Sequence, residues 1–285
     1  MVLRSLIQRL GFSAVINQQG PLPKAERILD LYVDVMIRSL TNSLYQDPSM
    51  IGRGEAFDLE NRVNGRDWPK QGFSMAGHKR LRSLADQVIE TVQNGVPGDF
   101  IETGVWRGGA CALVRGLYKA LDVSDRRVFV ADSFQGLPPP DPDSFPQDKN
   151  LDLSIYPELA IPLKEVKKTF EAYGLLDDQV QFVEGWFKDT LHKVDSQCFS
   201  IIRLDGDLYE STIQALDALY PKLSAGGYLI VDDYGAIPAC RKAVKDYRTT
   251  HGITSDIHEI DWTGVYWQRV GDSISNERTR NENVL

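Results

Sequence analysis

Asp-Phe-Ile-Glu-Thr-Gly-Val-Trp-Arg-Gly-Gly, residues 99–109, is the stretch of sequence that tells most about the fold. Phe100 and Ile101 suit a buried strand, and the glycines that follow let the backbone turn tightly and approach a ligand without a Cβ in the way. Residues 110–121 then carry apolar side chains at helical spacing. The stretch therefore predicts a strand, a turn and a helix N-terminus, the place where a ligand crevice forms in open α/β sheets.

The glycine pattern of this turn differs from the dinucleotide fingerprint. It runs Gly-x-x-x-Gly-Gly from Gly104, whereas a nicotinamide or flavin site is expected to show Gly-x-Gly-x-x-Gly. A second strand follows at 128–131 and ends in Asp132, which is well placed to accept hydrogen bonds from ribose hydroxyls. The pattern predicts an adenosine-containing cofactor, with a purely structural βαβ unit as the alternative.

Strands and helices alternate along most of the chain, which is typical of an α/β fold with a parallel sheet. The expected strands are 99–102, 127–131, 180–184, 199–204, 228–231, 257–260 and 265–269. The expected helices are 24–45, a helix that ends near Gln93, 109–121, 162–173, 211–222 and 237–250.

Acidic residues follow two of the expected strands. Asp205 ends one strand, Asp207 stands two residues on, and Asp232 and Asp233 end the next strand. Because parallel strands end at the same rim, Asp205, Asp232 and Asp233 can converge there. Clustered carboxylates repel one another, and the usual remedies are a divalent cation, a raised pKa or a basic neighbour. Oxygen ligands favour Mg²⁺, with Mn²⁺ or Ca²⁺ as alternatives; simple capping of strands and helices is the other possible role of these acids.

Five short segments occur in order along the chain. They are Glu-Thr-Gly-Val-Trp-Arg-Gly-Gly (102–109), Asp-Ser-Phe-Gln-Gly-Leu-Pro (132–138), Gly-Trp-Phe (185–187), Arg-Leu-Asp-Gly-Asp-Leu-Tyr-Glu-Ser (203–211) and Val-Asp-Asp-Tyr (231–234). Together they resemble the macrocin O-methyltransferase family, over about residues 25–270. The resemblance implies metal-dependent transfer of a methyl group from S-adenosylmethionine to a sugar hydroxyl, often on an antibiotic. It also implies a Rossmann-like class I methyltransferase fold, with a seven-stranded, mostly parallel sheet, helices on both faces and an antiparallel last strand.

The same resemblance gives roles to individual residues. Asp205, Asp232 and Asp233 are the expected metal ligands, and Asp205 is also the proposed catalytic base, with Asp207 as a residue that orients it. The expected cofactor-binding residues are Met75, Gly77, Glu102, Thr103, Gly104, Asp132, Ser133, Gly185, Trp186, Phe187 and Asp205. Coordination of the acceptor hydroxyl to a metal lowers its pKa and fixes its direction, so that a carboxylate can take the proton.

Two other classes of function stay open at this point. A nicotinamide-dependent sugar oxidoreductase would share the Asp132 site, but it should show a tighter glycine fingerprint and usually a Tyr-x-x-x-Lys pair. A non-catalytic binding protein of the same fold is the second alternative.

Four segments are expected along the chain. Residues 1–23 form an N-terminal arm, 24–98 a helical cap and lid segment, 99–272 the S-adenosylmethionine-binding core, and 273–285 a disordered tail. Two loops of unusual length are expected beside the site. Residues 46–72 have the composition of a lid or binding loop. Residues 138–162 are either a second lid facing the substrate or a loop packed flat on the body.

Composition limits the partners. A formal charge of −8 argues against nucleic acid as a partner, because proteins that bind it usually present clustered basic residues. The three cysteines have no metal-ligand spacing and indicate a reducing, cytoplasmic location, and residues 1–16 are too short and too charged to span a membrane. The expected partners are a small glycosylated or hydroxylated acceptor and further copies of the chain in a homo-oligomer such as a dimer.

Overall fold

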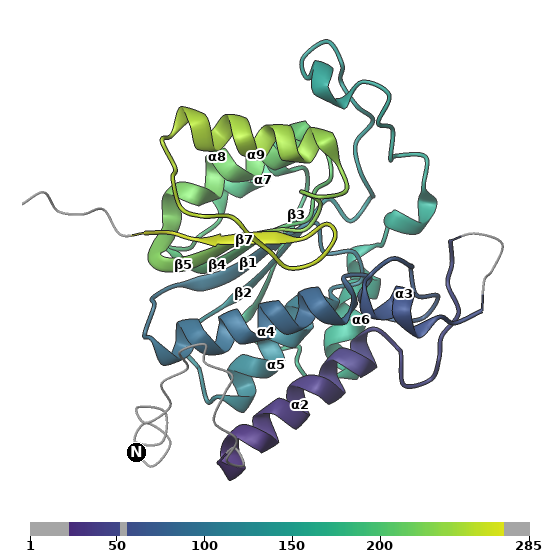
Figure 1. Cartoon of the computed structure of the whole chain (residues 1–285), viewed down its shortest axis with the longest axis vertical. Helices are drawn as coiled ribbons and strands as arrows, with labels where there is room; N and C mark the ends of the chain where they lie inside the picture. Colours follow the sequence, from purple (N-terminus) through teal and green to yellow (C-terminus); the bar gives the residue numbers. More distant parts are fainter. Residues whose placement is uncertain (1–22, 52–55, 271–285) are drawn as a thin grey trace, which may run out of the picture.

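A single seven-stranded sheet forms the centre of the protein in a computed structural model that describes residues 23–51 and 56–270 (Figure 1). Its strand order is β3-β2-β1-β4-β5-β7-β6. The strands are β1 (Asp99–Thr103), β2 (Val128–Asp132), β3 (Val180–Glu184), β4 (Phe199–Leu204), β5 (Leu223–Val231), β6 (His258–Glu259) and β7 (Val265–Gln268). Strands β1 to β5 pair in parallel, and β7 runs antiparallel to both of its neighbours. The predicted seven strands and reversed last strand are confirmed.

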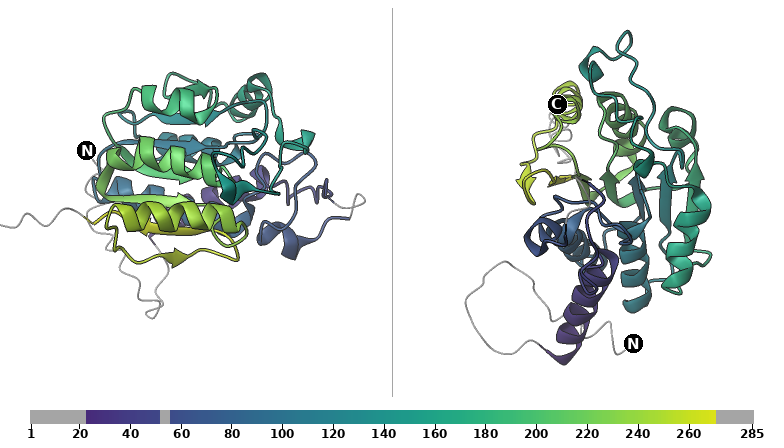
Figure 2. Two further views of the ribbon diagram at one scale, coloured as in Figure 1. Left: turned by 90° about the horizontal axis from the view of Figure 1, so that it is seen from above. Right: turned by 90° about the vertical axis from the view of Figure 1, so that its right-hand side faces the viewer.

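Helices cover both faces of this sheet (Figure 2). On one face lie α2 (Lys24–Leu40), α4 (Gly77–Gln93), α5 (Gly109–Ala120) and α6 (Leu163–Ala172); on the other lie α7 (Phe187–Thr190), α8 (Tyr209–Leu219) and α9 (Pro238–Thr250). A hydrophobic cluster lies between the sheet and the helices on each face. Successive strand residues point to opposite faces, so Phe100 joins the cluster beneath α4 and α5, and its neighbour Ile101 joins the cluster beneath α8 and α9. The central strands are apolar on both sides for this reason.

Two helices differ from the sequence prediction near the N-terminus. Helix α2 ends at Leu40, not near residue 45, because Asn42 adopts a left-handed conformation with φ of 52° and the chain turns there. Within residues 46–72, expected to be irregular, the short helix α3 (Leu59–Val63) forms. Its N-terminus is capped by Asp58, whose carboxylate accepts the backbone N–H of Asn61 at 2.7 Å.

Helix α8 and strand β5 also have bounds that the sequence did not predict. Helix α8 begins at Tyr209 and gives way to a 3₁₀ turn at Tyr220–Lys222, where Pro221 cannot continue the α-helical hydrogen bonds. Strand β5 begins at Leu223 instead of 228, and its pairing with β4 shifts register between Leu223 and Tyr228, a stretch that contains Gly226 and Gly227. A polar, glycine-rich run of this kind carries no strand signal.

The expected N-terminal arm and C-terminal tail lie, apart from residue 23, outside the described residues. Among the helices of the described ranges, no helix is both long and apolar enough to cross a membrane.

Candidate active site

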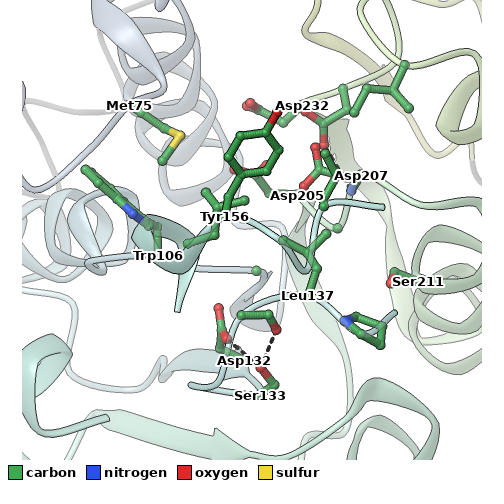
Figure 3. A pocket seen from close by; sticks show the side chains of 18 of the residues that line it. Met75, Trp106, Asp132, Ser133, Leu137, Tyr156, Asp205, Asp207, Ser211 and Asp232 are labelled. Carbon is green, nitrogen blue, oxygen red and sulfur yellow. Dashed lines mark hydrogen bonds between the residues drawn. The ribbon is translucent and has the colours of Figure 1, made fainter. Parts of the chain in front are cut away.

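A cavity of about 640 Å³ opens at the carboxyl ends of β1, β2, β4 and β5. Most of the site residues predicted from the sequence line it: Met75, Gly104, Asp132, Ser133, Trp186, Phe187, Asp205, Asp232 and Asp233. Figure 3 shows two separate groups of carboxylates, one formed by Asp132 beside Ser133 and the other by Asp205, Asp207 and Asp232. The cavity thus has two polar regions with different surroundings.

Asp132 joins the turns that follow β1 and β2. One carboxylate oxygen accepts the backbone N–H of Val105 at 2.8 Å, and the other accepts that of Phe134 at 2.7 Å. Burial raises the pKa of Asp132, and these backbone hydrogen bonds oppose the rise. The oxygen bound by Phe134 also accepts the hydroxyl of Ser133 at 3.4 Å, so the oxygen bound by Val105 keeps the capacity for a further hydrogen bond from a ligand.

Gly104 allows the ends of β1 and β4 to come together. Its φ of 83° is in the left-handed region, and a Cβ at this position would overlap the carbonyl oxygen of Asp205. The backbone N–H of Asp205 donates to the carbonyl of Thr103 at 2.9 Å. The glycine therefore sets how closely Asp205 approaches the turn after β1.

The remaining predicted cofactor residues do not line the cavity. Glu102 is buried beneath it and accepts hydrogen bonds from Cys111 and Arg203, and Thr103 is fully buried. Gly77 packs against the backbone of Gly65, and Gly185 donates its N–H to the carbonyl of Asp132 at 2.9 Å. These four residues pack against or hydrogen-bond to the segments around the cavity without lining it: Gly77, Glu102, Thr103 and Gly185.

The acidic cluster forms as the strand ends predicted. Asp205, Asp232 and Asp233 each offer a carboxylate oxygen, and these oxygens lie within 4.8 Å of one another. Asp207 also lines this end of the cavity, and its backbone N–H donates to Asp233 at 3.3 Å. A hard divalent cation prefers a set of oxygen ligands of this kind.

Two buried arginines accompany the acids, and sequence analysis did not identify either of them. Arg203, on β4, binds Glu102, Asp232 and, at 2.7 Å, Asp205. Arg80, on α4, binds Asp232 from the other side. The signal for Arg203 was a charged residue inside an apolar strand, where an unpaired charge is too costly to persist. The residues around Arg80 in the sequence gave no indication that it pairs with Asp232.

The pKa values of three of the acids are raised despite these arginines. Burial first, and then the charge of Asp232, raises the pKa of Asp205 to about 6. Burial and the neighbouring carboxylates raise the pKa of Asp207 to about 8 and that of Asp233 well above its usual range. Of the three expected remedies for clustered acids, the basic neighbours and the raised pKa values are therefore both present.

Aromatic and apolar side chains form the walls of the cavity. Loop 138–162 contributes Pro138, Pro139, Leu153, Tyr156 and Leu159, which identifies it as a wall of the cavity instead of a loop packed flat on the body. The edge of Tyr156 meets the ring of Trp68, with 5.9 Å between ring centroids.

Residues 56–72 contribute Gly65 and Trp68 to the lining of the cavity and are fastened to the body by polar contacts. Arg80 donates to the carbonyl of Gly65 at 3.1 Å, and Trp262 donates to that of Asn64 at 2.8 Å. The guanidinium of Arg66 stacks over Trp262, 4.4 Å from its ring centroid. Both Gly65 and Trp262 face the cavity.

Comparison with known proteins gives one family. The model of a family described as macrocin-O-methyltransferase (TylF) matches residues 24–269. Mycinamicin III 3''-O-methyltransferase of Micromonospora griseorubida is 47% identical over 247 residues, which are 85% of this chain and 97% of that protein. A tetracenomycin-C 4'-O-methyltransferase of Streptomyces olivaceus is 49% identical over 248 residues, 86% of this chain and 94% of the relative.

The fold has a counterpart among solved structures. The structure of the O-methyltransferase NovP superimposes with a TM-score of 0.82 at 47% identity, covering 85% of this chain and all of the other. The Rossmann-like fold expected from the five sequence segments is confirmed by this match.

Proposed function

The chain belongs to the macrocin-O-methyltransferase family and is an O-methyltransferase, and on that basis we propose its reaction in more detail. It transfers the methyl group of S-adenosylmethionine to a hydroxyl of a sugar on a glycosylated natural product of the antibiotic type. Asp205, Asp232 and Asp233 would hold Mg²⁺, which would polarise the acceptor hydroxyl. The observation that carries the proposal is the presence of two distinct carboxylate groups, Asp132 and the acidic cluster, in one cavity.

The cofactor fits the region around Asp132. A ribose presents two neighbouring hydroxyls as donors, and the carboxylate of Asp132 is held by two backbone N–H groups with acceptor capacity remaining. Met75, Trp186 and Phe187 supply apolar surface in the same cavity. S-adenosylmethionine bound there supplies an electrophilic methyl group.

The excess of carboxylates over basic groups in the acidic cluster suits a divalent cation. Five carboxylates, those of Glu102, Asp205, Asp207, Asp232 and Asp233, lie together, with Arg80 and Arg203 as the cations bound among them. The carboxylates outnumber the guanidiniums, and the raised pKa values of Asp207 and Asp233 mean that ionisation of the whole cluster is unfavourable without a further cation, which a divalent ion would supply. Both oxygens of Asp232 already accept from an arginine, which makes Asp205 and Asp233 the freer ligands. Mg²⁺ bound there supplies Lewis-acid polarisation of a hydroxyl.

The chain itself supplies the proton acceptor and its support. Asp205 lines the cavity at the end of β4 and is the residue we assign to take the proton of the attacking hydroxyl. Arg203 holds its carboxylate by a 2.7 Å hydrogen bond, the orienting role that the sequence suggested for Asp207. Asp207 instead supports Asp233 through its backbone N–H.

A glycosylated acceptor fits the walls of the cavity. Trp68, Tyr156 and Trp262 present aromatic faces and edges, against which the apolar face of a sugar ring or an aglycone can pack. The relatives described above are named for acceptors of this kind, mycinamicin III and a rhamnosyl tetracenomycin. A sugar oxidoreductase and a non-catalytic protein, the alternatives left open by the sequence, have no support in this family.

Parallel calorimetric titrations with S-adenosylmethionine, S-adenosylhomocysteine and NAD⁺ test the cofactor directly. We expect heat of binding with the first two and none with NAD⁺, followed by mass-spectrometric detection of methylated product from a panel of glycosylated polyketides. Binding of NAD⁺ with no binding of S-adenosylmethionine would overturn the proposal.

A further inference from the structure

Asp148 is a buried carboxylate that connects loop 138–162 to helix α8. It ends a 3₁₀ turn, η1 (Pro146–Asp148), and is 0% exposed. Its two oxygens accept the backbone N–H of Tyr209 at 2.7 Å and of Glu210 at 3.0 Å, which are the first two residues of α8. Leu208, the residue before the helix, has an apolar side chain and supplies no cap. The loop therefore provides the N-terminal cap of a helix that begins 61 residues further along the chain.

This cap has favourable electrostatics and additional packing. A carboxylate at a helix N-terminus interacts favourably with the helix dipole and satisfies N–H groups that have no partner within the helix. Phe145 packs against Tyr209, with 6.2 Å between ring centroids. The side chain of Tyr209 in turn donates to Asp246 on α9 at 3.0 Å. The middle of the loop is thus held to α8 and α9 together.

Helix α8 continues directly from the segment that carries two of the clustered acids. Asp207 has a left-handed φ of 58°, and the N–H of Leu208 donates to the carbonyl of Gly206 at 2.6 Å. A single residue separates Asp207 from the first residue of the helix. A shift of the first turn of α8 would therefore act directly on Asp207 and, through Gly206, on Asp205.

Loop 138–162 lines the cavity on both sides of its anchor. Pro138 and Pro139 precede Asp148, and Leu153, Tyr156 and Leu159 follow it. The returning half has a second attachment, from the indole N–H of Trp106 to the carbonyl of Glu158 at 2.9 Å. With the anchor at Asp148 removed, the described part of the loop between residue 138 and this attachment would keep only ring contacts with the body, those of Phe145 with Tyr209 and of Tyr156 with Trp68.

We propose that Asp148 is a positioning residue that fixes the acceptor-facing wall and the acid-bearing segment 205–207 through one cap. A displacement of the wall is then transmitted to Asp205 and Asp207, and the reverse also holds. That the wall binds the acceptor rests on the proposed function. The connection between loop 138–162 and α8 does not.

Hydrogen exchange on Asp148→Ala and Asp148→Asn tests the connection without reference to activity. Asp99→Ala is the matched control, because Asp99 is also buried and also accepts a backbone N–H (Arg127, 2.7 Å) and a second donor (Ser196, 2.9 Å), but at the start of β1. We expect exchange in residues 138–162 and 205–212 to rise about tenfold or more in Asp148→Ala, the effect of losing a helix cap. The rise should be smaller in Asp148→Asn, which keeps one acceptor, and absent from both segments in Asp99→Ala.

Kinetics then separate positioning from a merely structural role. Asp148→Ala should raise the KM for a glycosylated acceptor about tenfold and lower kcat, with the Kd for S-adenosylmethionine within about twofold of wild type and Asp148→Asn in between. Equal exchange in all three variants, or acceptor and cofactor affinities that fall together, would overturn the inference. If no acceptor is methylated even by the wild type, the proposed function fails, while the exchange comparison still decides the role of Asp148 in either direction.

Discussion

Arg80 on α4 donates to the carboxylate of Asp232 at the end of β5, 152 residues further along the chain. Both side chains are almost completely buried, at 6% and 5% exposed. The same guanidinium binds Asp261 at 3.1 Å and the carbonyl of Gly65 at 3.1 Å. One side chain therefore ties the acidic cluster to the wall formed by residues 56–72.

Arg80→Ala should destabilise the protein by about 3 kcal/mol, because removal of one partner leaves Asp232 and Asp261 buried with less compensation. Arg82→Ala is the control on the same helix, since Arg82 pairs with Asp30 at the surface and should contribute about 1 kcal/mol or less. The measurements are denaturant unfolding and limited proteolysis of residues 56–72. Equal stability and equal cleavage in the two variants would refute the role given to Arg80.

Asp132→Ala should weaken S-adenosylmethionine binding by about 1–3 kcal/mol, the usual cost of losing hydrogen bonds to a charged group. Calorimetric titration measures this change. Asp125→Ala is a suitable control, because Asp125 is exposed near the opposite end of β2. An unchanged affinity in the Asp132 variant would remove this residue from the cofactor site.

Glu102 should make the stability of the metal-free protein depend on pH. Burial raises the pKa of Glu102 from 4.5 to about 7, so between these values the folded protein holds a proton that the unfolded chain has lost. The contribution of Glu102 to stability is therefore largest below about pH 4.5, falls between pH 4.5 and 7, and levels off above pH 7, with a total loss of about 3 kcal/mol at most. Denaturant unfolding in EDTA at pH 5 and pH 8 measures the fall, and Glu102→Gln should reduce it.

Asp177→Asn is the control for this pH dependence. The hydrogen bond from Arg115 lowers the pKa of Asp177. The contribution of Asp177 to stability is therefore lost only when the pH falls below the ordinary pKa of an aspartate, which is outside the pH window tested. The change in the unfolding free energy of Asp177→Asn between pH 5 and pH 8 should match that of the wild type. A Glu102→Gln variant with the wild-type slope would contradict the assignment.

The sequence predicted those parts of the site that are local in the chain. Asp132 ends a strand, and Asp205, Asp232 and Asp233 lie within two residues after one. Strand ends in a parallel sheet converge regardless of the loops between them. The left-handed turn at Gly104 was likewise encoded in its own residue type. Such features need only spacing and the rules of sheet topology.

Contacts between distant segments were not predictable in this way. The hydrogen bonds from Arg80 to Asp232 and from Tyr209 to Asp148 join residues whose neighbours in the sequence carry no sign of the partner. Loop 138–162 was ambiguous because its apolar residues suit either a cavity wall or a packed surface loop, and the cap at Asp148 holds it in place. The homo-oligomer expected from the sequence stays a prediction.

The acidic cluster is proposed to hold a catalytic cation beside the cofactor. The most direct test is the rate of methyl transfer from S-adenosylmethionine to a glycosylated acceptor, measured with excess EDTA and after addition of Mg²⁺, for the wild type and Asp205→Asn. We predict that EDTA abolishes transfer while cofactor binding is retained, that Mg²⁺ restores transfer, and that Asp205→Asn lowers the rate about 100-fold to 10,000-fold. Full activity in EDTA, or a wild-type rate for correctly folded Asp205→Asn, would contradict the account.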